Sequence, residues 1–184
     1  MKNLIELHLH IDGSIRPSTV WDLAHKQNMV LTVPNPAALE KELIVPDNCT
    51  ALTEYLERFT LPLQVLQEAD AITRVTYELA EDLAAENITC AELRFAPGSC
   101  TRKGLFQEEA VEAAICGVKQ AILVYPHLHI GLILCCMRGD HDINKANKET
   151  IRLAAKYLGN VVCGIDLAGA ETLYPTSDYE GLFR

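Results

Sequence analysis

A strand-forming stretch near the start of the chain, residues 4–14, carries apolar and metal-seeking side chains on opposite faces. Its side chains alternate with period 2, as they do across a β-strand. One face consists of Ile5, Leu7, Leu9 and Ile11, and the other of Glu6, His8, His10 and Asp12. Imidazoles between carboxylates are not typical of a solvated strand face. We therefore predict a barrel strand whose apolar face packs on outer helices and whose histidines lie near its C-terminal end.

Three further strands follow at intervals that fit βα units. We predict strands at 89–96, 128–137 and 161–167, with helices at 68–86, 107–124 and 146–158. The gap between the first two strands is about twice as long as the others and contains a helical insertion. This order predicts an α/β fold, the first half (about four βα units) of a TIM (β/α)8 barrel. Half a barrel leaves two open edges, so a fragment, a chain that pairs with another, and a small open sheet all fit the pattern.

Composition and charge exclude several classes of function. The 184 residues suffice for one domain with a substantial core. A formal net charge of −9 argues against nucleic acid as a partner, and no apolar run is long enough to span a membrane. The seven cysteines lack regular paired spacing and are typical of reduced thiols. We therefore expect a cytoplasmic protein.

His8 and His10 form the candidate metal site. They lie two residues apart on one strand face, where both imidazoles can bind one divalent ion such as zinc. An isolated His-x-His pair is more often structural, because short motifs have many false positives. The Asp12-Gly13 pair that follows, together with the position at the strand's C-terminal end, favours the metal site.

The other histidines supply a comparison within the same chain. His127 and His129 also form a His-x-His pair, but they open the third strand and so belong to the stabilising end of a barrel. We therefore do not expect them to bind metal. His141 follows the third strand on the functional side and is a weaker candidate for substrate contact.

Three further groups of residues are candidates for the site. They are charged residues on otherwise buried strands, one glycine and one apolar helical stripe. We interpret Glu92, Arg94, Arg138 and Asp166 mainly as a structural ion-pair network, because charges do not stay buried unpaired. Gly169 follows the fourth strand and would let a ligand approach its N–H, although a turn glycine explains it equally well. A helical stripe, more often core than pocket, consists of Leu52, Tyr55, Leu56 and Phe59.

Five blocks of the sequence together resemble the adenosine deaminases. They are residues 6–17, 52–63, 92–97, 134–138 and 164–171, in the same order and across essentially the whole chain. The resemblance implies a zinc-dependent TIM barrel of the amidohydrolase superfamily with one zinc ion per full-length subunit. It implies the conversion of adenosine and 2′-deoxyadenosine to inosine and ammonia, a reaction of purine nucleoside salvage.

The resemblance also implies residue roles. His8 and His10 would be two zinc ligands, with His10 also near the substrate. Asp12 would contact the ribose hydroxyl, and Gly169 would donate its backbone N–H to a purine ring nitrogen. The apolar lid over the pocket would consist of Leu52, Tyr55, Leu56 and Phe59. Because related adenine deaminases tend to carry Glu where this chain has Asp12, the resemblance favours a nucleoside substrate.

The chain departs from the family pattern in what it lacks. The family's third zinc histidine and its general acid/base glutamate follow the fifth strand in a His-Ala-Gly-Glu motif, which does not occur here. We expect that glutamate beyond Arg184, so that residues 1–184 are the N-terminal portion of one barrel domain and are inactive alone. Ala170 stands where the family usually has an acidic residue. A related purine amidohydrolase such as an adenine deaminase, and a non-catalytic nucleoside-binding half-barrel, remain alternatives.

Overall fold

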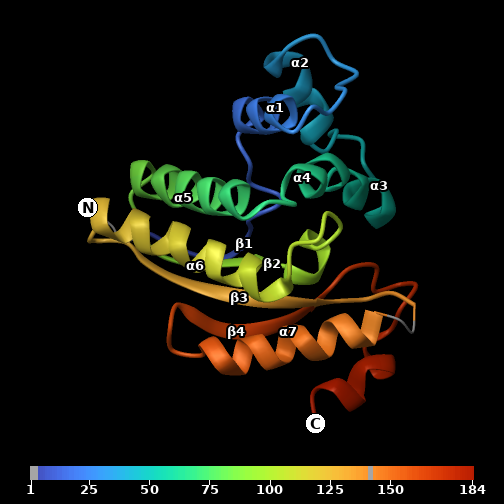
Figure 1. Cartoon of the computed structure of the whole chain (residues 1–184). Helices are drawn as coiled ribbons and strands as arrows, with labels where there is room; N and C mark the ends of the chain where they lie inside the picture. The colour runs from blue at the N-terminus through green and yellow to red at the C-terminus, as the bar shows by residue number, and fades with distance from the viewer. Residues whose placement is uncertain (1–3, 141–142) are drawn as a thin grey trace.

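In the computed structural model, four parallel strands form one sheet in the order of the sequence (Figure 1). The structure describes residues 4–140 and 143–184. The strands are β1 (Leu4–His10), β2 (Ile88–Phe95), β3 (His129–Met137) and β4 (Val162–Ala168). The predicted α/β half-barrel is therefore confirmed, because every connection between neighbouring strands is a crossover that contains helix. Parallel strands place all their carboxyl ends at one edge, which is where a barrel's chemistry lies.

Three long helices cover the outer face of the sheet. They are α5 (Ala69–Ala85), α6 (Gln107–Val124) and α7 (Ile143–Tyr157). Their apolar stripes pack with alternate residues of β2 and β3 into the core, whose largest fully buried members include Ile72, Leu93, Phe95, Leu132, Leu134 and Leu153. The contact between α5 and α6 is close at Gly117, where an added Cβ would lie 2.6 Å from the carbonyl oxygen of Thr73.

Four short helices form the insertion between β1 and β2. They are α1 (Pro17–Lys26), α2 (Pro36–Leu43), α3 (Leu52–Glu57) and α4 (Thr60–Val65). Pro17 and Pro36 each occupy a first turn, where a missing N–H costs nothing, and the Asn35 side chain accepts a hydrogen bond from the N–H of Ala38 at 2.8 Å. The helical stripe of Leu52, Tyr55, Leu56 and Phe59 does not lie on one unbroken helix, although the pattern predicted one. The chain breaks at 58–59 instead, and Pro62 is accommodated in the first turn of α4.

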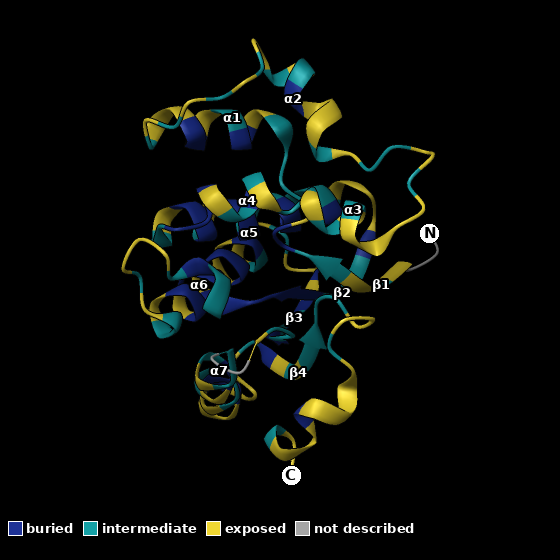
Figure 2. Ribbon diagram, turned by 90° about the vertical axis from the view of Figure 1, so that its right-hand side faces the viewer, coloured by how far each residue is buried: buried dark blue, intermediate teal, exposed yellow. Residues whose placement is uncertain are grey.

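The first half of β1 is more exposed than its sequence pattern predicts. Ile5 is 63% and Leu7 54% exposed, and Figure 2 shows this part of the strand in the exposed colour. The prediction that these residues pack on outer helices is therefore wrong. The reason is that β1 is an edge strand that pairs only with β2, so its outer face lacks a covering element. Leu9 does pack against the core, and Ile11 is fully buried.

Side chains from α7 and the C-terminal segment hold the carboxyl end of β3. The Asn147 side chain accepts from the N–H of Met137 at 2.8 Å and donates to its carbonyl at 2.9 Å. The Tyr179 hydroxyl, on the short 3-10 helix Thr176–Leu182, bonds both backbone groups of Gly139. Another 3-10 helix, Pro97–Cys100, follows β2. These contacts fix the loops that surround the strand ends.

The next features are the state of the seven cysteines and the lengths of the helices. All seven cysteines are free thiols. Cys100, Cys135 and Cys136 are buried and act as small core residues. Within residues 4–140 and 143–184, no helix combines the length and the apolar character that a bilayer crossing requires.

Candidate functional site

An open cleft of about 560 Å³ lies at the carboxyl ends of the four strands. All four strands contribute to it, and α3 borders it from the insertion. The eight residues to which the resemblance assigns roles all line this cleft: His8, His10, Asp12, Leu52, Tyr55, Leu56, Phe59 and Gly169. These residues are up to 161 positions apart in the chain, so the fold alone brings them together.

His8 and His10 project from the end of β1 with converging ring nitrogens. The two Nε2 atoms are 3.3 Å apart. Two nitrogens that bind one tetrahedral zinc ion at about 2.0–2.1 Å would be separated by roughly 3.3–3.4 Å. Burial, and to a smaller extent His8 and Arg94, lower the pKa of His10, which keeps its imidazole in the neutral form that binds metal. The pair therefore fits two sites of a zinc coordination sphere.

The described part of the chain supplies no further ligand to this pair. Within residues 4–140 and 143–184, no group of three or more His, Cys, Asp and Glu side chains is placed to hold a metal ion. A catalytic zinc commonly takes three protein ligands and leaves one position for water. His141, the weaker candidate, lies outside the described residues. The predicted second pair, His127 and His129, is exposed at the opposite end of the sheet, as expected.

Asp12 follows the histidines and is almost completely buried. It is 7% exposed, and its Oδ1 lies 3.8 Å from Nδ1 of His10. Burial raises the pKa of Asp12 to about 6, because a carboxylate loses hydration in this position. Asp12 Oδ1 has no hydrogen-bond partner among the described residues. A buried acceptor of this kind is suited to a hydroxyl donor of a ligand.

The apolar stripe, on α3 and at Phe59 just after it, borders the cleft beside the histidines instead of packing in the core. Leu52 and Tyr55 are 42% and 40% exposed, and the stripe borders the cleft. The ring of Phe59 stands edge-on to His10, with ring centroids 5.7 Å apart, and Tyr55 contacts Phe59 at 5.6 Å. The stripe thus offers apolar surface next to the candidate metal ligands, where the apolar part of a ligand is shielded from water.

Gly169 follows β4 in a conformation that favours glycine. Its φ is +112°, and an added Cβ would lie 3.3 Å from Cβ of Arg138. Within the described residues its N–H makes no hydrogen bond, so it can serve a ligand in the cleft. Glu171, beside Ala170, accepts a hydrogen bond from Arg138 at 3.2 Å, and this ties the loop after β4 to the loop after β3.

One ion pair crosses the floor of the cleft. Arg94 donates from Nη1 to Asp166 at 2.6 Å and from Nη2 to the carbonyl of Leu7 at 3.2 Å. The structural ion pair expected for these residues is present, whereas Glu92 forms no ion pair among the described residues. Arg138 instead anchors the C-terminal loops through Tyr174, Glu171 and Thr176. The ion pair on the floor of the cleft therefore joins only two of the four charged residues that the sequence pattern grouped together.

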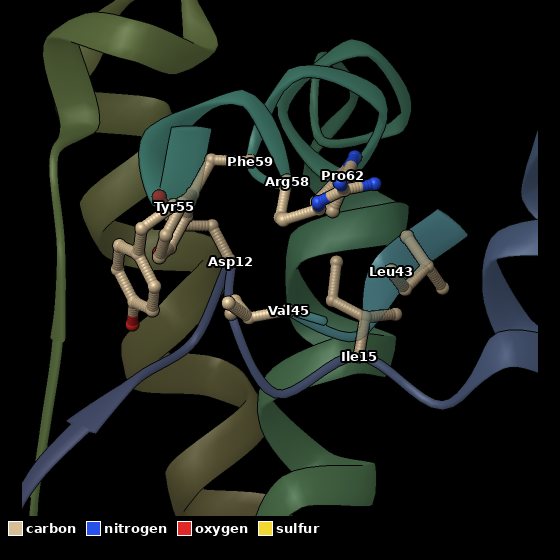
Figure 3. A pocket seen from close by; sticks show the side chains of 9 residues that line it. Asp12, Ile15, Leu43, Val45, Tyr55, Arg58, Phe59 and Pro62 are labelled. Atoms are coloured by element: carbon tan, nitrogen blue, oxygen red, sulfur yellow. The ribbon is translucent and has the colours of Figure 1, made fainter. Parts of the chain in front are cut away.

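Sequence reasoning missed one residue next to the site. Arg58 shares a small cavity with Asp12, Tyr55 and Phe59 (Figure 3). No sequence signal identified it, because a single arginine on a short helical segment is usually solvated and the chain break after α3 was not foreseen. In Figure 3 the Arg58 side chain points toward Pro62, and its Nη1 donates to the carbonyl of Glu42 at 3.3 Å.

Comparison with known sequences identifies one family. The family model for adenosine deaminase matches residues 4–183. An adenosine deaminase from Haemophilus ducreyi is 40% identical over 98% of this chain and 53% of its own length. An adenosine deaminase from Clostridium botulinum (strain 657) is 43% identical over 91% of this chain and 50% of its own length. The chain spans about half the length of the curated relatives it matches.

Comparison with solved structures agrees with the half-barrel. An adenine deaminase from Arthrobacter aurescens matches with a TM-score of 0.84 at 23% identity, covering 100% of this chain and 54% of its own. Arabidopsis ADAL complexed with GMP gives 0.79 at 28%, covering 98% and 53%. An amidohydrolase from Burkholderia ambifaria with bound Zn gives 0.81 at 21%, covering 99% and 48%. Each aligned region is about half of the known structure.

Proposed function

Because the chain belongs to the adenosine deaminase family, we propose that it forms the first half of a zinc site that deaminates adenosine and 2′-deoxyadenosine to inosine and ammonia. The observation that carries this proposal is the pair of His8 and His10 nitrogens, 3.3 Å apart in the cleft that also contains Asp12 and the lid. Residues 1–184 then form the N-terminal portion of one TIM-barrel domain, and the remaining half of the barrel is required.

In this proposal, His8 and His10 hold the zinc ion through Nε2. The chemistry that zinc supplies when bound is Lewis-acid activation of a water molecule for attack on the ring carbon that bears the amine. The low pKa of His10 keeps its nitrogen free of a proton and available to the ion. The third ligand and the general acid/base glutamate come from the other half of the barrel, which this chain does not contain.

The other residues of the cleft bind and orient the nucleoside. Asp12 accepts a hydrogen bond from a ribose hydroxyl, because its Oδ1 is buried and lacks another partner. Gly169 donates its N–H to a purine ring nitrogen from the opposite side of the cleft. The lid residues Leu52, Tyr55, Leu56 and Phe59 cover the purine and exclude bulk water from the reacting carbon.

The choice of substrate class follows from Asp12. A free base such as adenine has no ribose hydroxyl to satisfy a buried carboxylate, so adenosine is favoured over adenine. The reaction is a step of purine nucleoside salvage, and the seven free thiols support a cytoplasmic location. Nucleic acid and membranes are not partners in this proposal.

Zinc content and deaminase activity test the proposal together. At its natural length, the protein is expected to bind one zinc ion and to convert adenosine faster than adenine or AMP. The 184 residues alone are expected to retain zinc weakly and to leave adenosine unconverted, because they hold only two ligands and no general base. Tight stoichiometric zinc on the short chain would show that another of its residues completes the site.

A matched pair of variants locates the metal. His8→Ala should abolish zinc binding and activity in the protein of natural length, because it removes one ligand. His129→Ala is the control, since it removes an exposed histidine of the second His-x-His pair at the far end of the sheet. Equal zinc loss in both variants, or adenosine left unconverted by the zinc-loaded natural-length protein, would contradict the proposal.

A further inference from the structure

Arg94 contacts β1 on both sides of the candidate metal pair. Its Nη2 donates to the carbonyl of Leu7 at 3.2 Å, in the peptide bond that leads into His8. Its own backbone carbonyl accepts a hydrogen bond from the N–H of Ile11 at 2.8 Å, directly after His10. One residue of β2 therefore holds the strand immediately before the first histidine and immediately after the second.

The pairing of β1 with β2 is irregular where His8 lies. The paired residues shift from Glu6 and Ala91 to Leu9 and Leu93, so β1 has one residue more than β2 between these pairs. An extra residue of this kind interrupts the ladder of hydrogen bonds between two strands. The described strands also give β1 only one neighbour, which is β2. The backbone that carries His8 thus lacks a regular partner residue, and the guanidinium supplies a contact at this point.

The guanidinium is itself held by the fourth strand. Arg94 is 8% exposed, and its Nη1 donates to Oδ2 of Asp166 at 2.6 Å. The other carboxylate oxygen of Asp166 accepts from the N–H of Leu167 at 2.8 Å, which fixes the carboxylate against β4. A planar guanidinium that is bound at both Nη atoms has little freedom to rotate. The contact to the Leu7 carbonyl is therefore made by a side chain whose orientation is already set.

Stability alone explains this ion pair poorly. The cost of removing charges from water commonly offsets their attraction, and apolar replacements of such pairs are often neutral. Nε of Arg94 is buried without a hydrogen-bond partner among the described residues, which adds to the cost. A guanidinium that is paired in register with His10 would also, by its charge alone, repel a bound cation. What the arginine provides is geometry, namely a fixed contact at the peptide before His8.

We propose that Arg94 is a positioning residue for the pair of His8 and His10. Its bond to the Leu7 carbonyl fixes the peptide that carries His8, while backbone pairing fixes His10. Together these contacts hold the two Nε2 atoms 3.3 Å apart. Groups that orient metal ligands contribute about ten- to a hundredfold to metal affinity. The inference deepens the proposed function and rests on it for the identity of the ion, whereas the positioning of the two imidazoles does not.

Zinc affinity of the protein at its natural length, measured by competition with a chelator, tests the positioning role. Arg94→Met removes a positive charge near the ion, so electrostatics alone would tighten zinc binding. Positioning predicts the opposite sign, and we expect zinc binding to weaken about tenfold. The double variant Arg94→Met, Asp166→Asn removes one charge of each sign, leaves no unpaired carboxylate that could impair folding, and should show the same loss. Unchanged or tighter zinc binding in the double variant would overturn the proposal.

Arg138→Met is the matched control for zinc affinity. The Arg138 side chain is 6% exposed, against 10% for Arg94, and it too binds a carboxylate and a backbone carbonyl. Its side-chain hydrogen bonds among the described residues go to the segment after β4 and not to β1. Arg138→Met should lower the free energy of unfolding but change zinc affinity by less than about twofold. Equal losses of zinc affinity in Arg94→Met and Arg138→Met would overturn the proposal.

Metal-free crystal structures of the natural-length wild type and of the double variant separate this inference from the proposed function. We expect the Nε2 atoms of His8 and His10 to lie close to 3.3 Å apart in the wild type and farther apart in the variant. The same histidine geometry in both structures would overturn the positioning role. A wild type that binds no zinc would contradict the proposed function, and the metal-free structures would still decide whether Arg94 positions the pair.

Discussion

At Gly13 the backbone of the first turn touches the lid directly. An added Cβ would lie 3.1 Å from Cε1 of Phe59 and 3.3 Å from Cβ of His10. Both neighbours are parts of the candidate site, so a side chain here would push the lid ring away from β1. The absence of a side chain at one position thus sets how closely α3 approaches the histidines.

Gly13→Ala is therefore expected to lower the stability of the protein by about 1 kcal/mol, because the added methyl overpacks the contact with Phe59. Chemical denaturation measures this change. The double variant Gly13→Ala, Phe59→Leu should recover part of the loss, since a smaller side chain makes room. Gly181→Ala is the control, because its Cβ would meet nothing within 4 Å. Equal losses in the two alanine variants would argue against the packing explanation.

That His8, His10 and Asp12 share one side of β1 was predictable, but the contact of Arg58 with the neighbouring cavity was not. His8, His10 and Asp12 stand together in the sequence, and period 2 alone places them on one strand face. The Arg58 contact with the cavity depends on a chain break at 58–59 and on an approach across 46 residues of sequence, from 12 to 58. Local patterns carry no information about either of these features.

At the scale of one element, β3 ends in a contact that replaces a missing strand neighbour. Asn147 on α7 is 2% exposed and pairs with both backbone groups of Met137, which borders the cleft. An amide side chain carries an NH2 donor group and a carbonyl acceptor in the same plane, so it can imitate a peptide group. The end of β3 is thus fixed by a helix and not only by the sheet.

Asn147→Ala should destabilise the protein by about 2 kcal/mol, because it leaves the N–H and carbonyl of Met137 without partners. Thermal or urea unfolding measures the loss. Asn160→Ala, at an exposed position, should change the free energy of unfolding by less than about 0.5 kcal/mol. A small effect of Asn147→Ala would mean that water replaces the side chain at the end of β3.

Helix α5 is tied to the start of the insertion by charge. Arg16 donates to Glu81 at 2.8 Å and, through Nε, to Asp82 at 3.0 Å. The hydrogen bond from Arg16, assisted by one from Tyr125, lowers the pKa of Glu81 below its ordinary value. A lowered folded-state pKa contributes stability above the unfolded pKa, and this stability is lost as the pH falls through the folded value.

The stability difference between the wild type and Arg16→Met should therefore shrink as the pH falls below about 4. Urea unfolding at neutral pH and at acid pH measures this difference. The Glu81→Gln background is the control, since Arg16→Met should show a weaker pH dependence there. A gap between wild type and Arg16→Met that stays constant with pH would mean that Glu81 contributes nothing to the contact.

The sequence predicted the bounds of the helices and strands more accurately than it predicted which of their residues are buried. Helix α6 has the predicted bounds, and β2, β3 and β4 begin and end within one residue of the prediction, because apolar period and turn residues determine both. The exposure of Ile5 and Leu7 was not predictable. Their alternation is that of a covered strand, and although half a barrel predicts two open edges, the pattern of residues 4–14 does not show that this strand lies at one of them.

At the scale of the whole molecule, the sheet has two unpaired edges with apolar side chains. Ile5 and Leu7 on β1 are more than half exposed, and Ile165 on β4 is 40% exposed. Unpaired parallel edges with apolar residues favour association with other chains. In a closed barrel both edges are paired with neighbouring strands. A sheet of these four strands alone therefore exposes two edges that favour association.

We therefore expect the 184 residues alone to associate with rising concentration, as light scattering or sedimentation would show. Ile5→Lys together with Leu7→Lys should reduce this association while changing the free energy of unfolding little, because both side chains are exposed. Ile11→Lys, at a fully buried position, should prevent folding instead. Unchanged association of the double-lysine variant would show that the β1 edge is not the contact surface.

The pairing of β1 with β2 also sets a waiting time during protein synthesis. Leu4 pairs with Ile88, so the strand that carries both histidines has no partner until the whole insertion has been made. At about 5–20 residues per second, the ribosome needs roughly 4 to 17 seconds for that stretch. Each later strand waits for only one helix. The two candidate metal ligands are thus among the first residues to be made, and their strand waits longer for its first neighbour than any other strand of this sheet.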